Sequence, residues 1–413
     1  MQIEFKTRLP EWTWIESAKS KGNAIEIEPE PDPYLEISDG ESEKSVELQN
    51  APPGNSRFVL IENEKLGQGE MVEVDIEEKI NYFRKEHRYK LDNPQKVILT
   101  YENYELRTID MLRLAPDTFL NDSVVNFFMK LFGSFAFTKE ARRDIHVFNT
   151  YFWKNLETSV KSIAQLVKSR AQAQTMMFEQ YKSISKAHKA VDLFSKKHLL
   201  IPINRQGHWS VMLATNVTSL LHCAQKKVEC SSLPASLRPN IYYLDPLWDS
   251  DTTLGGILRL YLEAALFHVL GPEYQGALSF RQPAEKYLVT EKSMPDHQAI
   301  TPSQRNAFDC GLFVLEYVEN FCADPQSFIE KMVAGRNNSR WFPHSMVGFK
   351  RVMLINVIMQ RMNGMEYPEI LLKYMESRQA LRANTENDDA EFEDPASIVQ
   401  NNKAFIEEIP PPF

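Results

Sequence analysis

The 413-residue sequence is poor in cysteine and carries no excess of positive charge. Each of these features argues against particular kinds of site or partner. Its four cysteines are too few and too scattered for a disulfide framework or a zinc site. With 56 acidic and 47 basic residues, the formal net charge is −9. That balance disfavours nucleic acid as the main partner, because phosphate binding needs a clustered positive surface. We expect a reducing compartment, the nucleus or the cytoplasm.

Long apolar runs are also missing. No stretch approaches the ~18 uninterrupted apolar residues of a membrane helix. The opening segment, MQIEFKTRLPEWTWIESAKSKG, has interspersed charges in place of the apolar core of a secretory signal. We therefore expect neither secretion nor membrane association. The sequence has no phosphate-binding loop and no HExxH motif, so we expect no organic cofactor and no metal.

Composition divides the chain into three parts. Residues 1–94 are acidic and include a segment rich in Glu, Pro, Ser and Gly (21–56), and residues 377–413 are similarly polar. Such segments bury too little apolar area to offset the entropy lost on ordering, so we expect both to be largely disordered. Between 95 and 376 the apolar residues become periodic and turn signals regular, which predicts one folded domain.

Strands are mixed with helices in this domain, which predicts an α+β fold. A helix is expected over 119–132, capped by Asn121 or Asp122. Two strands, 198–204 and 208–215, are separated by the turn RQG. A further strand is expected over 240–247 and a buried helix from Gly311 onward. Residues 157–193 are expected to be helical and 216–239 to form an inserted loop.

The ends of these elements carry residues of a thiol nucleophile site. Cys310 stands at the expected N-terminus of a helix, where unpaired backbone N–H groups favour a thiolate. His208 opens a strand and is the candidate base, and Asp245 ends the next strand and is the candidate partner of the imidazole. Gln304 precedes Cys310 by six residues and can donate to an oxyanion together with the Cys310 N–H.

Each of these residues alone has an ordinary structural explanation. A cysteine beside a buried helix is usually core, a histidine beside Trp is usually structural, an aspartate before Pro is usually a turn former, and a loop glutamine is usually solvated. All four at the ends of regular elements favour the nucleophile interpretation.

The segments FLNDSVVNFFMKLF, HVFNTYFWKNL, LLIPINRQGHWSVML, IYYLDPL and PSQRNAFDCGLFVLEYVENF resemble the Ulp/SENP family of SUMO-specific cysteine proteases. The resemblance covers about residues 95–375. It implies a papain-like α+β fold with the catalytic residues in the permuted order His, Asp, Cys, and a mixed central sheet flanked by helices. It also implies that His208 is the base, Asp245 its orienting partner, Cys310 the nucleophile and Gln304 an oxyanion donor.

The resemblance further implies a slot between two aromatic side chains for the C-terminal Gly-Gly of SUMO. Trp209 matches one wall, and Phe119 stands where the family often has Trp. A slot between flat rings admits residues without a Cβ, so selectivity is steric. The Phe-Leu-Asn-Asp form, the 37-residue gap from His208 to Asp245 and the segment 157–193 resemble the branch that trims SUMO chains.

Two acidic-flanked runs in the N-terminal part resemble SUMO-interacting motifs, which add a strand to the edge of the modifier's sheet. The stronger one is FVLIENE, with Phe58, Val59, Leu60 and Ile61, and the weaker one is YLEISDGESE (34–43). The alternative for both is a strand of the protein itself or a chance run in an acidic segment.

The sequence leaves three other functions open. The chain can be a protease for another ubiquitin-like modifier, a catalytically idle SUMO-binding module, or an acyltransferase that uses the same Cys/His pair. Competent residues at all four site positions disfavour the binding module, and the slot aromatics disfavour the acyltransferase.

Overall fold

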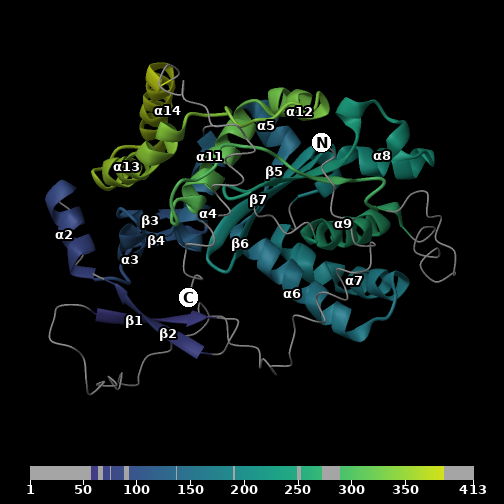
Figure 1. The fold of residues 1–413 in the computed structure, drawn as a ribbon, viewed down its shortest axis with the longest axis horizontal. Coiled ribbons are helices and arrows are strands. Elements are labelled where there is room, and N and C mark those ends of the chain that lie inside the picture. The colour runs from purple at the N-terminus through teal and green to yellow at the C-terminus, as the bar shows by residue number, and fades with distance from the viewer. Residues whose placement is uncertain are drawn as a thin grey trace, which may run out of the picture.

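The computed structural model describes residues 57–63, 68–74, 76–87, 93–135, 137–188, 191–248, 253–271 and 289–385. Figure 1 shows the order of the elements along this part of the chain. The strands are β1 (Arg57–Asn63), β2 (Gln68–Val74), β3 (Val97–Tyr101), β4 (Tyr104–Arg107), β5 (Ile145–Val147), β6 (His198–Arg205), β7 (His208–Thr215), β8 (Asn240–Leu244) and β9 (Asp296–Gln298).

Helices account for much of the remaining described chain. They are α2 (Ile76–Glu86), α3 (Thr108–Met111), α4 (Asp122–Phe135), α5 (Lys139–Asp144), α6 (Thr150–Leu166), α7 (Arg170–Ile184), α8 (Thr218–Lys226), α9 (Leu254–Leu270), α11 (Cys310–Ala323), α12 (Pro325–Val333), α13 (His344–Met362) and α14 (Tyr367–Thr385).

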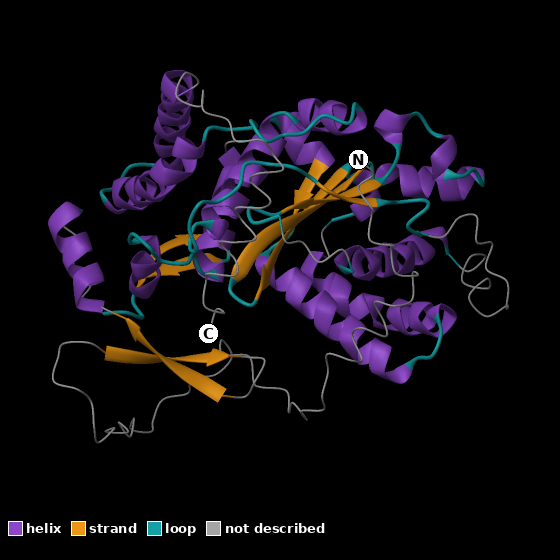
Figure 2. Cartoon of the chain, viewed as in Figure 1, coloured by secondary structure: helices purple, strands orange, loops and turns teal. Residues whose placement is uncertain are grey.

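A five-stranded sheet in the order β5-β6-β7-β8-β9 lies at the centre, and β1-β2 and β3-β4 form separate hairpins. The central sheet is mixed: β5 runs parallel to β6 and β8 parallel to β9, while β7 is antiparallel to both of its neighbours. Helices flank this sheet on both sides (Figure 2). The α+β class and the mixed sheet expected from the sequence are therefore confirmed.

Alternation along β7 sends side chains into two apolar cores. Trp209, Val211 and Leu213 belong to the core that also contains α4 and α11, whereas Met212 and Ala214 belong to the core beneath α6, α7 and α9. A strand with apolar residues on both faces is buried, which explains the continuous apolar run in the sequence.

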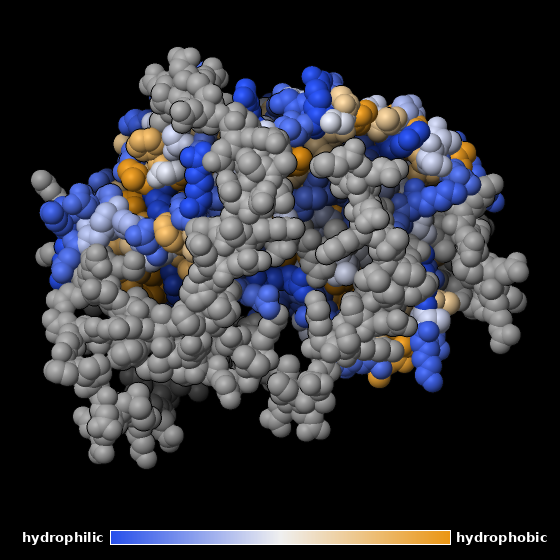
Figure 3. Space-filling view, viewed as in Figure 1, coloured by the Kyte–Doolittle hydropathy of each residue, from blue (hydrophilic) through white to orange (hydrophobic). Residues whose placement is uncertain are grey.

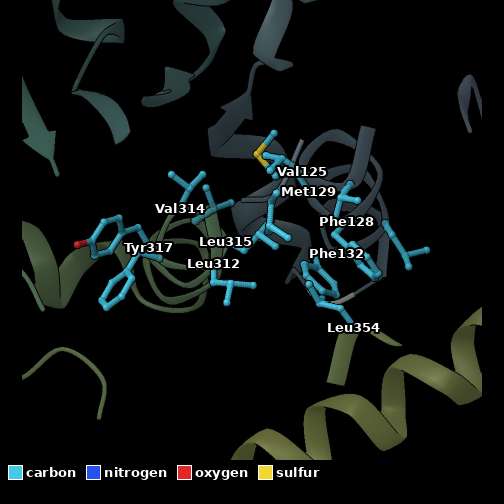
Figure 4. Close-up of a cluster of buried hydrophobic side chains, with 14 of the residues drawn as sticks. Val125, Phe128, Met129, Phe132, Leu312, Val314, Leu315, Tyr317 and Leu354 are labelled. Atoms are coloured by element: carbon cyan, nitrogen blue, oxygen red, sulfur yellow. The ribbon is translucent and has the colours of Figure 1, made fainter. Parts of the chain in front are cut away.

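Helix α11 packs against α4 through large apolar side chains. Figure 4 shows Leu312 and Leu315 of α11 beside the α4 cluster that includes Phe128 and Phe132, with Leu354 of α13 below them. These residues are fully or almost fully buried. The packing fixes the direction of α11 and hence the position of its first residue, Cys310.

The expected elements near the site are present. Helix α4 begins at Asp122, and the Asn121 side chain caps it by accepting from the Val124 N–H at 3.2 Å. Strands β6 and β7 form the expected hairpin, in which Gln206 and Gly207 have positive φ angles of 57° and 80°. This two-residue turn with both central residues left-handed suits the twist of antiparallel strands.

The prediction of a loop over 216–239 is wrong. Residues 218–226 form α8, because Leu220, Cys223 and Ala224 share a buried face. Within the expected helical range 157–193, α6 continues to Leu166 and α7 spans Arg170–Ile184, so most of its described residues are helical.

The expected domain limits differ from the described elements at both ends. β1, β2 and α2 lie within residues 1–94, and Phe83 of α2 is fully buried in the core of α4 and α11. At the other end α14 continues past residue 376, because Arg378 pairs with the buried Glu316 and Glu319 of α11. The run YLEISDGESE lies outside the described residues.

None of the helices in the described ranges has the length and apolar composition needed to cross a bilayer. On the face of the molecule shown in Figure 3, apolar residues that grey atoms do not cover form small groups among polar ones.

Candidate active site

The first turn of α11 and the adjacent ends of β7 and β8 meet at one point. His208 is the first residue of β7, Asp245 directly follows β8, and Cys310 is the first residue of α11. In the β7–β8 register Val211 pairs with Leu244, which brings the start of β7 beside the end of β8. The structure therefore brings together the three residues predicted as base, orienting carboxylate and nucleophile.

His208 contacts both of its expected partners. Its Nε2 lies 2.9 Å from Oδ1 of Asp245, and its side chain also hydrogen-bonds to Cys310. The carboxylate of Asp245 is buried and its Oδ1 also accepts from the Leu247 N–H at 2.8 Å. A carboxylate held in this way fixes the orientation of the imidazole.

The electrostatics favour a protonated imidazole. Burial alone lowers the pKa of His208, but hydrogen bonds to Asp245 and Cys310 outweigh it and raise the pKa to about 10. An imidazolium next to a cysteine stabilises the thiolate, which is the nucleophilic form.

The other three cysteines lie in different surroundings. All four are buried free thiols. Burial raises the pKa of Cys322 and of Cys230, and Cys230 has the Cys223 thiol as a neighbour. These environments suit core packing and not nucleophilic attack.

Gln304 is buried on the loop that leads to Cys310. Its backbone N–H donates to the carbonyl of Pro246 at 2.9 Å, which places the loop beside the residue after Asp245. Its Nε2 donates to the Asn306 carbonyl at 2.7 Å, and an amide NH₂ has a second hydrogen to give. The backbone N–H of Cys310 belongs to the first residue of α11, where an amide has no acceptor within the helix.

The two aromatic residues expected to form a slot differ in exposure. Trp209 is fully buried, whereas Phe119 is 41 % exposed. The Trp209 indole N–H donates to the carbonyl of Leu120, the residue after Phe119, at 2.9 Å. The link places Phe119 near the start of β7, with its ring available for a ligand.

The close approach of Leu120 explains why a glycine, Gly311, follows Cys310. A Cβ at this position would lie 2.9 Å from Cβ of Leu120, closer than real Cβ contacts come. Glycine therefore lets the first turn of α11 approach the segment that carries Phe119. The sequence shows the Asp-Cys-Gly motif but does not show that Leu120 is the reason for its glycine.

Arg351 of α13 is a site residue that the sequence analysis missed. Its guanidinium pairs with Asp309, the residue before Cys310, at 2.8 Å. Forty-two residues separate the two, and no motif marks the position. Among the described residues, no group of three His, Cys, Asp or Glu side chains could hold a metal ion.

Residues 118–342 match the model of the Ulp1 protease family, C-terminal catalytic domain. This match spans more than half of the chain. The chain belongs to the Ulp1 protease family. All the candidate catalytic and slot residues lie inside the matched region, while Arg351 lies nine residues beyond its end.

Several curated Ulp1-family relatives are similar to this chain. Probable ubiquitin-like-specific protease 2A of Arabidopsis thaliana is 27 % identical over 291 residues, covering 68 % of this chain and 33 % of the relative. Ubiquitin-like-specific protease 2 of Schizosaccharomyces pombe is 26 % identical over 233 residues, covering 53 % and 33 %. The chain thus spans about a third of the length of these relatives. A crystal structure of a de-sumoylating protease superposes with a TM-score of 0.43 at 20 % identity, covering 67 % of this chain and 94 % of that one.

Proposed function

We propose that this chain is a thiol protease and isopeptidase that cleaves after the C-terminal Gly-Gly of SUMO and releases it from lysines of target proteins. One observation carries the proposal: His208 contacts both Asp245, at 2.9 Å, and Cys310 at the tip of α11. Membership of the Ulp1 family supports the same chemistry.

The mechanism follows from these two contacts of His208. The Cys310 thiolate attacks the carbonyl carbon of the last glycine, and the negative charge moves to the carbonyl oxygen. The second N–H of the Gln304 amide and the backbone N–H of Cys310 are the donors for this oxyanion. His208 then gives its proton to the departing lysine amine, and a thioester to Cys310 remains.

The second half of the reaction uses the same imidazole. His208, now neutral, takes a proton from water, and the resulting hydroxide attacks the thioester carbonyl. Collapse of the intermediate returns the thiolate and frees the glycine carboxylate. Asp245 keeps the imidazole in one orientation through both halves.

Phe119 and Trp209 are proposed to form the walls of the diglycine slot. Because Trp209 is buried and anchored to Leu120, it forms the fixed wall, while the exposed ring of Phe119 closes over the glycines. A side chain with a Cβ at either glycine position would then meet a ring face.

The proposal is tested with a SUMO probe that carries a C-terminal electrophile. We expect the probe to label the wild-type chain on Cys310 and to leave Cys310→Ser unlabelled. Probes of other ubiquitin-like modifiers run in parallel test modifier choice. Labelling by another modifier in place of SUMO would assign the chain to that modifier, and SUMO binding without labelling or cleavage would make it a binding module.

The finer role proposed here is the trimming of SUMO chains in the nucleus or the cytoplasm. β1 contains Phe58, Val59, Leu60 and Ile61, and within the described residues it pairs with β2 alone, so its other edge has no strand partner. This edge is proposed to bind a second SUMO unit. Val59→Ala combined with Ile61→Ala should slow cleavage of SUMO chains and leave cleavage of a single-SUMO precursor unchanged; equal slowing of both would contradict this role.

A further inference from the structure

Arg351 connects three segments that build the site. It is buried on α13, and its guanidinium lies among acceptors from two loops. Its Nε and Nη2 donate to Oδ1 of Asp309 at 3.2 and 2.8 Å. The same guanidinium donates to backbone carbonyls of the loop before Cys310 and of the segment before Phe119, namely Phe308, Arg113, Ala115 and Thr118.

The Asp309 carboxylate in turn shapes the loop before Cys310. Its Oδ2 accepts from Nδ2 of Asn306 at 2.8 Å, and Oδ1 of Asn306 accepts from the N–H groups of Phe308 and Asp309. The Asp309 carbonyl accepts from Leu312 and Phe313 and so begins α11. Arg351 therefore holds the residue from which the nucleophile helix starts.

The same guanidinium fixes the other side of the site. Thr118, whose carbonyl it binds, directly precedes Phe119, and Leu120 beyond it receives the Trp209 indole N–H. One planar cation with five N–H donors can serve both sides at once, which an ammonium group cannot.

The pairing also has an electrostatic consequence. The charged groups around Cys310 are the imidazolium of His208 on β7, Asp245 after β8, Asp309 on its own loop and Arg351 on α13. The apolar Leu120, just before α4, lies against Gly311, the residue after Cys310. Asp309 directly precedes Cys310 in the sequence. Without Arg351, its carboxylate would lose the cation that it pairs with, and a negative charge near a thiol disfavours ionisation of that thiol.

We propose that Arg351 is a positioning residue: it neutralises Asp309 beside the Cys310 thiolate and sets the spacing between the nucleophile loop and the Phe119 wall of the diglycine slot. The second half of this statement rests on the proposed function, and the first half does not.

The test separates charge from geometry with two substitutions. Arg351→Met removes both the charge and the hydrogen bonds of the guanidinium, whereas Arg351→Lys keeps the charge alone. For each we would measure the rate of Cys310 alkylation by iodoacetamide against pH, in a chain with the other three cysteines replaced by serine or alanine. This measurement needs no SUMO, so it is valid even if the protein acts on another ubiquitin-like modifier.

Arg351→Met should move the midpoint of the alkylation profile upward by about one pH unit. Arg351→Lys should leave the midpoint near that of wild type. Adding Asp309→Asn to Arg351→Met should restore the midpoint, because the uncompensated charge is gone. The double variant also avoids a half-buried carboxylate without a cationic partner, so it should fold even if Arg351→Met alone does not. Arg361→Met on the same helix, whose partner Glu366 lies away from the site, is the matched control and should leave the profile unchanged.

Cleavage of a SUMO precursor tests the geometric half. Arg351→Lys and the double variant should lose roughly a hundredfold in kcat/KM, since misplacement by about 1 Å costs that much. An unchanged alkylation midpoint in a folded Arg351→Met chain would overturn the electrostatic half, and normal kcat/KM in Arg351→Lys would overturn the geometric half. If wild type cleaves no SUMO at all, the proposed function fails while the alkylation result still decides the role of Arg351 toward Cys310.

Discussion

The indole Nε1 of Trp209 donates a hydrogen bond to the carbonyl of Leu120 at 2.9 Å. The bond joins the second residue of β7 to the turn just before α4, across 89 residues of sequence. Trp209 also belongs to the core of α4 and α11. Trp209 and Phe119, the proposed walls of the slot, are therefore linked through the carbonyl of Leu120, the residue after Phe119. Their spacing depends on the packing of this core.

Phe119→Ala should reduce kcat/KM for a SUMO precursor by about tenfold or more, because the exposed ring no longer covers the diglycine. Exposed positions change the free energy of unfolding by about 0.5 kcal/mol or less, so thermal stability should stay near wild type. Phe119→Trp is the conservative control and should keep its activity. Full activity in Phe119→Ala would remove Phe119 from the slot.

Trp209→Ala should lose most turnover, but for two reasons at once. It removes a slot wall, and it opens a cavity in the core at a cost of about 3–5 kcal/mol. Thermal unfolding measured beside cleavage separates these effects, with Trp209→Phe as the smaller change. Near-normal precursor cleavage by Trp209→Ala would contradict the slot assignment.

Gly311→Ala should destabilise the fold by about 1–3 kcal/mol, because the new Cβ meets Leu120 in a packed core. Gly348→Ala on α13 is a matched control, since a Cβ there meets nothing within 4 Å. It should stabilise the protein by about 0.5–1 kcal/mol through helix propensity. Chemical denaturation of both variants tests the pair, and equal effects would refute the close approach at Leu120.

Asp245→Asn should lower kcat by roughly a thousandfold or more, as loss of the orienting carboxylate does in related triads. It also removes a hydrogen bond that raises the pKa of His208 to about 10. That pKa lies above the unfolded value near 6.5, so the ion pair stabilises the fold below pH 6.5 and loses this contribution as pH rises through about 10. The histidine NMR titration should shift downward in Asp245→Asn, and an unmoved titration would contradict the contact.

Arg378→Met should destabilise the fold by about 3 kcal/mol, because Glu316 and Glu319 lose one of their buried cationic partners. Burial opposes ionisation of Glu316, but Arg378 and Lys350 lower its pKa to about 2. A depressed carboxyl pKa stabilises the fold above about pH 4.5 and loses that contribution as pH falls toward 2. The gap between wild type and variant should therefore be largest above pH 4.5 and should narrow below it.

Lys373→Met is the matched control for this prediction, since Lys373 pairs with Glu369 on the exposed side of the same helix. It should change stability by less than about 0.5 kcal/mol. A chain ending at Glu376 should resemble Arg378→Met, while a chain ending at Thr385 should not. Equal stability of the two truncated chains would show that the buried cluster does not need Arg378.

Local patterns predicted the elements that carry the site. Apolar runs with a turn between them located β6 and β7, and the apolar spacing after Gly311 located α11, because these signals lie within a few neighbouring residues. The three candidate catalytic residues came from the ends of those elements. The register of β7 and β8 brings His208 beside Asp245, whereas the packing of α11 against α4 places Cys310.

Contacts between residues far apart in the sequence could not be predicted in this way. Arg351 reaches Asp309 from another helix, and Leu120 limits Gly311 from before α4; neither pairing leaves a periodic pattern. Arg378 lies in a polar segment whose composition predicts a disordered tail. The sequence does not show that Arg378 pairs with the buried Glu316 and Glu319. α8 was missed because its buried face has only three small or branched residues, Leu220, Cys223 and Ala224, among polar ones.

The chain passes from β7 to β8 through α8 at the sheet end that lies away from His208 and Asp245. Ladder bonds between the two strands, not the connecting residues, determine how the imidazole meets the carboxylate. The exposed end of α8 near Lys226 should therefore accept a spliced reporter peptide without disturbing turnover, which offers a place to attach a fluorophore for following the enzyme at work.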